Sequence, residues 1–340
     1  MRVMELKDAW GLEHLRPGTR PEPVPGAGEV VVRIEAASVN YRDLVVARRG
    51  YGRRTGALPL VPVSDGAGRV VATGAGVTRV GVGDPVCPAF AQTWMDGPLR
   101  DEHWTGMLGG PRDGVLQEFM LLHEGGVVRA PAHLDAVQAA TLPCAGLTAW
   151  NAVVAAGGVK PGDIVLTQGT GGVSLFVLRF AKMLGARVIV TSSSDEKLAR
   201  ARALGADETI NYRAVPEWGK RAREIAAPGG VDLVVDLAGS VDESVRAVRT
   251  GGTVALVGVL GGATARLDLG PVVTRAIRLQ AVTVGSRAMF EDMVRAIEAH
   301  RAEPVLELSP RRFDGAADAI ASLAGGGHFG KLCLRAWDDG

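Results

Sequence analysis

A glycine-rich turn between two apolar segments constrains the fold of this chain more than any other feature. Residues 163–174 read DIVLTQGTGGVS, and an apolar stretch continues to residue 184. The hydrophobic run 164–166 predicts a buried strand, the glycines predict a tight turn, and the following stretch predicts a helix. Strand, turn and helix in this order open a βαβ unit.

The same turn has the residues that a dinucleotide phosphate requires. Gly169 permits the tight turn, Gly171 lets a pyrophosphate approach the backbone, and Ser174 is small enough for helix–sheet packing. The helix N-terminus supplies unpaired N–H groups and a partial positive charge. A turn without a ligand is the alternative, but the strand and helix around it favour dinucleotide binding. The expected phosphate contacts are Gly169, Thr170, Gly171, Gly172, Val173 and Ser174.

Two kinds of pattern divide the chain. From about residue 135, expected strands at 163–168, 186–191, 231–236 and 253–258 alternate with expected helices near 172–184, 195–204, 215–226 and 241–249. This alternation predicts an α/β fold with a Rossmann-type, doubly wound parallel sheet. The first part is β-rich, with short strands at 30–34, 68–72, 84–89 and 117–122. The tail, with strands 278–284 and 330–335 and helices 289–300 and 314–323, is expected to fold back onto it. We therefore predict a domain of residues 1–134 completed by 282–340, and an inserted domain of residues 135–281.

Composition excludes several classes of protein. The chain has 340 residues, a formal net charge of +1 and three cysteines. No apolar run approaches the roughly 18 residues of a membrane span, and the charged N-terminus lacks the core of a signal peptide. Mixed charge gives no footprint for nucleic acid or membrane. We expect a soluble, cytoplasmic protein without a disulfide framework.

The end of the second strand of the inserted domain bears on which nicotinamide cofactor is bound. An NAD site places an acid there for the ribose diol. This chain instead has Ser192, Ser193 and Ser194, followed by Lys197. Hydroxyl donors and a cation suit a 2′-phosphate, so the loop favours NADPH over NADH. Ser193 and Glu196 also form a capping box for the next helix, and both interpretations can hold together.

Several segments together resemble the medium-chain dehydrogenase/reductase superfamily. They are ASVNYRDL (37–44), PLVPVSDGAG (59–68), ATLPCAGLTAW (140–150), QGTGGVS (168–174), SSSDEKLARARALGAD (192–207), INYR (210–213) and HFGKL (328–332). The chain is most similar to the zinc-independent, quinone-oxidoreductase-like branch, often labelled zinc-type alcohol dehydrogenase-like. The resemblance implies a GroES-like substrate domain, an inserted Rossmann domain, hydride transfer in the cleft between them, and a homodimer formed by edge pairing of strand 278–284.

The resemblance also indicates that zinc is not used. Zinc-dependent members have a cysteine, a histidine, and a cysteine or acid in three matching segments. This chain has Asn40, then Ser64 followed by Asp65, and only Cys144 is retained. A catalytic zinc needs three protein ligands, and segment 91–114 lacks the four cysteines of a structural zinc lobe. We expect no zinc, and we expect Cys87 and Cys333 in strand cores. The six histidines show no ligand spacing, and only His103 is kept as a substrate-site candidate.

Without a metal, reduction of a quinone or an α,β-unsaturated carbonyl is easier than oxidation of an alcohol. The resemblance places Asn40 and Tyr41 near the nicotinamide and the carbonyl, as catalytic candidates. The Tyr41 hydroxyl is the expected donor to the developing oxyanion. In the alternative, Tyr41 only packs and solvent supplies the proton. Arg42 and Asp43 are expected to form a structural ion pair.

The resemblance assigns further residues to the cofactor. Thr148 is expected beside the nicotinamide or its ribose, and Lys197 and Tyr212 at the 2′-phosphate. The carboxamide side of the cleft is expected to be formed by Gly258, Val259, Gly285 and Ser286, with Phe329 and Lys331 closing the tail on the cofactor. Phe90, Trp94, Trp104 and Met107 are candidates for an apolar substrate pocket, although aromatic residues in a loop often only anchor it.

Three functions are therefore open. The first is an NADPH-dependent, zinc-independent reductase of quinones or enones. The second is an NAD(P)-dependent alcohol dehydrogenase or carbonyl reductase. The third is a cofactor-binding regulatory protein with little catalysis.

Overall fold

The protein forms two compact units in the computed structural model, which describes residues 1–262 and 264–338. Unit 1 is formed by Met1–Leu147 together with the chain from Gly285 onward, and unit 2 by Thr148–Val284. The first boundary falls after residue 147 and not after 134, because helix α2 (Ala136–Ala139) packs on strands β3 (Glu29–Val39) and β4 (Asp65–Thr73) of unit 1. Among the described residues, no helix combines the length and the apolar character needed to cross a membrane.

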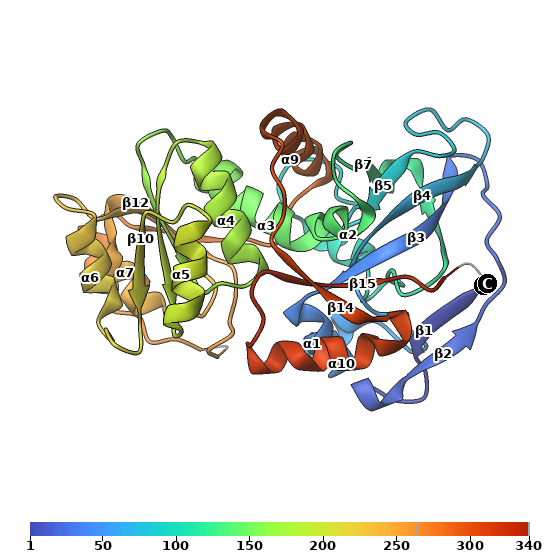
Figure 1. Ribbon diagram of the computed structural model, residues 1–340, viewed down its shortest axis with the longest axis horizontal. Helices are drawn as coiled ribbons and strands as arrows, with labels where there is room; N and C mark the ends of the chain where they lie inside the picture. The colour runs from blue at the N-terminus through green and yellow to red at the C-terminus, as the bar shows by residue number, and fades with distance from the viewer. Residues whose placement is uncertain (263, 339–340) are drawn as a thin grey trace. The chain divides into compact units, whose positions relative to one another are not determined.

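Unit 2 is a parallel six-stranded sheet flanked by helices (Figure 1). The strand order is β10-β9-β8-β11-β12-β13, which is the Rossmann order 3-2-1-4-5-6 counted from β8. The doubly wound sheet expected from the sequence is therefore confirmed. Its strands are β8 (Ile164–Gln168), β9 (Arg187–Ser192), β10 (Glu208–Asn211), β11 (Val231–Asp236), β12 (Val248–Leu256) and β13 (Arg278–Ala281).

The helices expected in unit 2 are present with shifted ends, and further short helical segments that were not expected accompany them. They are α3 (Leu147–Trp150), the π-helical turn η6 (Asn151–Ala155), α4 (Gly172–Met183), α5 (Asp195–Ala203), α6 (Trp218–Ile225), α7 (Val241–Ala247) and α8 (Leu269–Thr274). The helix expected to reach residue 249 ends at Ala247, because Val248 already pairs with Val231 in the sheet. The core contains Leu166, Ile189, Val234 and Val254, which are almost completely buried.

Unit 1 is built on a seven-stranded sheet and a separate hairpin (Figure 1). The path is β14-β15-β3-β4-β5-β7, with β6 paired to β3. Strand β15 of the tail pairs antiparallel with β3 of the first segment, with Leu332 opposite Val39. This pairing confirms that the tail returns to the first domain. The remaining strands are β1 (Arg2–Leu6) and β2 (Leu15–Thr19) in the hairpin, and β5 (Pro85–Pro88), β6 (Phe119–His123), β7 (Val127–Arg129), β14 (Leu306–Arg312) and β15 (Lys331–Arg335).

Helices and short helical turns complete unit 1. Helix α1 begins directly after β3, at Tyr41, because β3 ends at Val39 and Asn40 takes the N-cap position. Besides α1 (Tyr41–Ala47), the helices are α9 (Arg287–His300) and α10 (Ala316–Ser322). The short helical turns are η1 (Leu12–His14), η2 (Gly52–Thr55), η3 (Asp101–Gly106), η4 (Glu124–Gly126), η5 (Leu142–Gly146), η7 (Phe313–Gly315) and η8 (Leu323–Gly325).

Candidate functional site

A polar cluster lies in unit 1 where β3 passes into α1 and where β15 begins. Antiparallel pairing of β15 with β3 brings Lys331 beside the end of β3. The Lys331 ammonium donates to the Val39 carbonyl at 2.8 Å and to Asn40 Oδ1 at 2.6 Å. The lysine is only 3% exposed. Its charge is therefore held inside the unit, next to the candidate residue Asn40.

Asp65 is the carboxylate that faces this lysine. It begins β4, opposite Ser38 of β3, and it is completely buried. The Lys331 Nζ–Asp65 Oδ2 distance is 3.8 Å, the Ser64 hydroxyl donates to Oδ1 at 2.9 Å, and the Cys144 backbone N–H donates to Oδ2 at 3.2 Å. Burial raises the pKa of Asp65, whereas Lys331 and the hydrogen bonds from Asn40 and Ser64 oppose the rise.

The backbone before Ser64 is strained. Val63 has a φ of +69°, which a β-branched residue rarely adopts. The chain at Gly109 and Gly114 approaches Val63 so closely that an added Cβ would lie 2.7 Å and 2.0 Å from its backbone carbon and oxygen. Strain of this kind persists where the surroundings fix the backbone, and it is common at functional sites.

Asp43 is a second fully buried carboxyl in this region. The Asn40 backbone N–H donates to its Oδ2 at 2.7 Å, and the Arg42 guanidinium lies 3.6 Å from its Oδ1. Burial raises the pKa of Asp43 to about 6, with Arg42 acting in the opposite direction. The ion pair expected between Arg42 and Asp43 is confirmed. Arg42 also donates to the carbonyls of Leu108 and Gly110 and lies over the Phe90 ring at 4.7 Å.

These residues do not fit a catalytic zinc. Within the described ranges, no group of three or more His, Cys, Asp or Glu residues is arranged to hold a metal. Burial, together with the nearby Asp65 charge, raises the pKa of the Cys144 thiol, which opposes the thiolate that a metal requires. Cys87 and Cys333 are buried in β5 and β15, as expected.

Two tyrosines that follow β3 in the chain are candidate proton donors, and only one was anticipated. Tyr41 is the first residue of α1 and is 42% exposed. Tyr51 follows the helix, and partial burial raises the pKa of its phenol. Arg42 lowers this pKa, whereas Cys144 and Asp43 raise it slightly. Tyr51 is 43% exposed. Sequence reasoning missed it, because a single tyrosine outside the motif segments has no distinguishing pattern.

Most aromatic residues of the loop 91–114 make contacts that stabilise the loop. Trp94 is 3% exposed, stacks on His103 with ring centroids 5.7 Å apart, and donates to the Gly97 carbonyl at 2.9 Å. His103 Nδ1 accepts from the Arg100 N–H at 3.0 Å. Phe90 and Met107 are buried, and Trp104 lies under the Arg54 guanidinium at 4.6 Å. These contacts are those of a loop anchor, and a substrate role for the four candidates stays a prediction.

The glycine turn of unit 2 has the geometry that a phosphate site requires. Gly169 has a φ of +80°, which favours glycine, and its N–H donates to the Thr191 carbonyl. The Ser174 hydroxyl donates to the Gln168 carbonyl at 2.7 Å, which ties the first turn of α4 to the end of β8. Gly171 caps the helix without a side-chain hydrogen bond to its N–H groups. The turn is therefore suited to an anionic ligand.

The end of β9 lies beside this turn, and the end of β10 lies beside β9. β10 pairs with β9 so that Asn211 lies opposite Ser192, and the Tyr212 N–H donates to the Ser192 carbonyl at 3.1 Å. Ser194, and not Ser193, is the N-cap of α5, and its hydroxyl accepts from the Lys197 N–H at 3.3 Å. The capping box expected from Ser193 was therefore wrong by one residue, because β9 extends to Ser192. Capping uses Ser194 and leaves Ser193 outside the cap.

The remaining cofactor candidates lie in both units. Thr148 is in α3, almost buried, and Gly258 follows β12, where an added Cβ would lie 2.4 Å from the Leu237 carbonyl oxygen. Val259 is 63% exposed. In unit 1, Gly285 packs on Leu147 and the Ser286 hydroxyl caps α9. Phe329 is buried. The Lys331 ammonium contacts Asn40 in the cluster described above, and a contact of Phe329 or Lys331 with the cofactor stays a prediction.

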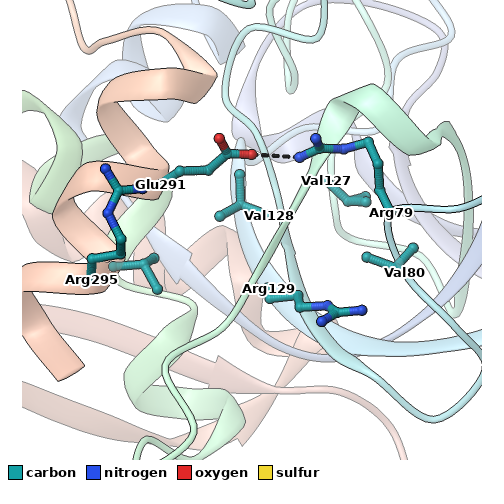
Figure 2. A pocket seen from close by; sticks show the side chains of 8 residues that line it. Arg79, Val80, Val127, Val128, Arg129, Glu291 and Arg295 are labelled. Carbon is teal, nitrogen blue, oxygen red and sulfur yellow. Dashed lines mark hydrogen bonds and ion pairs between the residues drawn. The ribbon is translucent and has the colours of Figure 1, made fainter.

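A further hollow of about 300 Å³ lies on unit 1 beside α9, lined in part by three arginines (Figure 2). Arg79 pairs with Glu291, as the dashed line shows. Arg129 pairs with Asp84, and Arg295 with Asp292. Because these cations already have carboxylate partners, the hollow is not a candidate for the reactive site.

The fold, with a GroES-like unit and a Rossmann-type unit, is that of a two-domain oxidoreductase. Residues 26–132 match the family model described as "Alcohol dehydrogenase GroES-like domain", and residues 172–299 match "Zinc-binding dehydrogenase". A zinc-type alcohol dehydrogenase-like protein of Schizosaccharomyces pombe is 38% identical over 98% of this chain and 99% of its own length. The chain belongs to the zinc-type alcohol dehydrogenase-like family of the medium-chain dehydrogenase/reductase superfamily.

Other similar proteins differ in the cofactor and activity that their names state. A chloroplast envelope quinone oxidoreductase homologue of Arabidopsis thaliana is 32% identical over 70% of this chain and 67% of its own. A solved NAD-dependent alcohol dehydrogenase is 34% identical, with a TM-score of 0.89 over 99% of this chain and 100% of its own. A mycobacterial protein in complex with NADPH is 26% identical, with a TM-score of 0.80 over 98% of this chain and 99% of its own.

Proposed function

We propose that this oxidoreductase is an NADPH-dependent reductase of quinones or α,β-unsaturated carbonyls that works without zinc. The observation that carries the proposal is the cluster around Asn40. Its lysine, carboxylate and serine hydroxyl are already engaged with one another, and they offer no set of metal ligands. A reaction that needs a Lewis acid to ionise an alcohol is therefore disfavoured, and reduction of an electron-poor acceptor is favoured.

Unit 2 has the groups that would hold the cofactor. The N–H groups at the start of α4 suit the pyrophosphate, and the hydroxyls of Ser192, Ser193 and Tyr212, with Lys197, suit a 2′-phosphate. Neither Asp nor Glu stands between Ser192 and Ser194, where an NAD site places an acid. When bound, NADPH supplies the hydride.

Unit 1 would supply orientation and a proton donor. Lys331 holds Asn40 Oδ1, so the carboxamide keeps one orientation. The hydroxyls of Tyr41 and Tyr51 are the candidate donors to the oxyanion that develops on the acceptor. Tyr51 joins Tyr41 as a candidate because burial raises the pKa of its phenol, which keeps the proton on the hydroxyl.

The test is oxidation of NADPH by metal-analysed protein, with phenanthrenequinone or a simple enone as acceptor and NADH as the control. Turnover by zinc-free protein, faster with NADPH, is expected. No turnover on any acceptor, with NADPH still bound, would favour a regulatory role with little catalysis.

The second candidate is an NAD(P)-dependent alcohol dehydrogenase or carbonyl reductase, which the names of several similar proteins favour. This activity predicts alcohol-dependent reduction of NADP or NAD. If that activity rises with bound zinc, the argument from Asn40 and Ser64 is wrong.

A further inference from the structure

Gln168, the last residue of β8, makes hydrogen bonds that the proposed function leaves unexplained. It is only 5% exposed and directly precedes the glycine turn. Its side-chain Oε1 accepts the N–H groups of Leu237 and Ala238, at 3.3 Å and 2.9 Å. These two N–H groups follow the end of β11, which pairs with β8. A single amide therefore connects the ends of two neighbouring strands.

The other end of the amide is fixed as well. Gln168 Nε2 donates to the Ser244 hydroxyl at 2.9 Å, and this hydroxyl donates to Asp236 Oδ2 at 2.7 Å. The second carboxyl oxygen of Asp236 accepts the Gly239 N–H at 2.7 Å. Asp236 and Ser244 are completely buried. Because buried polar groups are costly to leave unpaired, these bonds favour a single conformation of residues 237–239.

The backbone of the same residue holds the start of α4. The Gln168 carbonyl accepts the Ser174 hydroxyl at 2.7 Å. The loop after β11 is also held by the chain after β12, where the Gly261 N–H donates to the Ala238 carbonyl at 2.8 Å. Gln168 therefore contacts both the helix that follows the glycine turn and the loop that follows β11.

The ends of β8 and β11 form the switch point of the parallel sheet. In the order β10-β9-β8-β11-β12-β13, the chain runs outward from β8 in one direction and from β11 in the other. Doubly wound sheets bind their ligands at the carboxyl ends of the strands at such a point. The N–H groups at the start of α4 have no side-chain cap, whereas those of Leu237 and Ala238 are occupied by Gln168. This arrangement directs a dinucleotide phosphate to α4.

We propose that Gln168 is a positioning residue for the dinucleotide, because its side chain occupies the N–H groups after β11 and fixes residues 237–239 relative to the glycine turn. The inference rests on the cofactor site of the proposed function, but not on the choice between NADPH and NADH. The diphosphate is common to both cofactors, so loss of the Gln168 amide should weaken both by the same factor. Loss of Lys197 and Tyr212 should instead weaken mainly NADPH.

Gln168→Met keeps the length of the side chain and removes its hydrogen bonds. Titration calorimetry of the full-length protein with NADPH and with NADH measures the effect. Both dissociation constants should rise about tenfold, because the loop after β11 then has its binding conformation in only a fraction of the molecules. Gln117→Met is the matched control, since Gln117 is equally buried and its amide donates to the Gly114 carbonyl of unit 1. Its dissociation constants should stay those of the native protein.

A rescue by acid separates positioning from a general loss of packing. In Gln168→Glu, the protonated carboxyl can accept from Leu237 and Ala238 and donate to Ser244, as the amide does, whereas the ionised form has no donor. Affinity for NADP⁺ is compared with that of the native protein at each pH, so that titration of the cofactor itself cancels. The variant should match the native protein at about pH 5 and bind at least about tenfold more weakly at about pH 8.

The surroundings of position 168 support this pH dependence. Asp236 of β11 belongs to the same network, and a carboxylate there adds to burial in keeping the new carboxyl protonated in acid. The other neighbours, Thr191 of β9, Ser174 of α4 and Ser244 of α7, do not titrate in this range. In Gln168→Met, the affinity relative to the native protein should therefore be independent of pH.

Native affinity for both cofactors in Gln168→Met, or equal weakening of Gln168→Glu at both pH values, would overturn the inference. A native protein that binds neither cofactor would overturn it too. Equal binding of NADPH and NADH by the native protein, or binding without turnover, would contradict the proposed function alone. Should Gln168→Met fail to fold in urea-unfolding controls, the acid rescue of Gln168→Glu remains the deciding result.

Discussion

At the scale of single residues, Asp43 shows how the fold controls a charge. Its side chain is completely buried beside Arg42 and accepts the Asn40 N–H. Burial raises its pKa to about 6, above its ordinary value of 3.8. The folded state therefore holds this proton more tightly than the unfolded state. The protonated form favours folding below about pH 4, and this contribution is lost as the pH rises through about 6.

Asp43→Asn should remove this pH dependence, because the amide stays neutral and keeps an oxygen for the Asn40 N–H. The unfolding free energy of the variant, relative to the native protein, should rise between about pH 4 and pH 7 by up to about 3 kcal/mol. Urea unfolding across this range measures it. Asp101→Asn is the control, because the Asp101 side chain is 96% exposed. A relative stability of Asp43→Asn that does not change with pH would contradict the burial argument.

The strand-end hydroxyls and Lys197 predict a preference for NADPH that a pair of substitutions should remove. Lys197→Ala with Tyr212→Phe takes away the cation and one hydroxyl from the expected 2′-phosphate site. Since hydrogen bonds to charged groups contribute about 1.5–3 kcal/mol, the dissociation constant for NADPH should rise about tenfold or more. That for NADH should change little.

Calorimetric titration of metal-free protein with NADPH and with NADH measures this selectivity. Lys220→Ala removes an exposed lysine from α6 and serves as the control. If the double variant weakens both cofactors equally, the residues do not recognise the 2′-phosphate.

At the scale of elements, Gly258 shows how closely the ends of β11 and β12 approach. An added Cβ would lie 2.4 Å from the Leu237 carbonyl oxygen, which is backbone and cannot rotate away. Gly258→Ala should therefore destabilise unit 2 by about 1–3 kcal/mol, as overpacking does. Urea unfolding checks the change against Gly229→Ala, where an added Cβ meets nothing within 4 Å. Equal stability of the two variants would show that the backbone at 258 relaxes without cost.

Local patterns predicted the strands and helices with strong periodicity, because burial of one face leaves a repeating signal. The parallel sheet of unit 2 and the return of the tail were predicted in this way. Short elements such as β1, β2, β7 and β14 were missed, since they depend on pairing with distant segments. The boundary after Leu147 was missed for the same reason, because α2 is tied to unit 1 only by tertiary packing.

The sequence also predicted only the parts of the candidate site that depend on local motifs. Asn40 and the glycine turn were identified because their motifs are local. The contact of Lys331 with Asn40 joins residues 291 positions apart, and only the pairing of β15 with β3 creates it. The Ser193 cap was displaced by one residue, because helix ends follow the exact end of the preceding strand.

At the scale of the whole molecule, the parallel sheet of unit 2 has an edge that needs protection. In the part of the chain that the structure describes, β13 pairs only with β12. Val259, Leu260, Leu269 and Val273, in the segments between these strands, are 56–76% exposed. An unpaired strand with exposed apolar neighbours tends to associate, and two-fold association is the commonest way to cover it. We therefore propose a homodimer formed at the β13 edge.

Light scattering should give the mass of two chains for the native protein, and Val273→Asp should shift it toward one chain. The reason is that a carboxylate on α8, close before β13 in the chain, would lose its water if the second copy covers it. Val24→Asp changes a valine that is 83% exposed in unit 1, so its mass should stay that of two chains. A native protein with the mass of a single chain would contradict the dimer. An equal effect of both substitutions would place the contact away from the β13 edge.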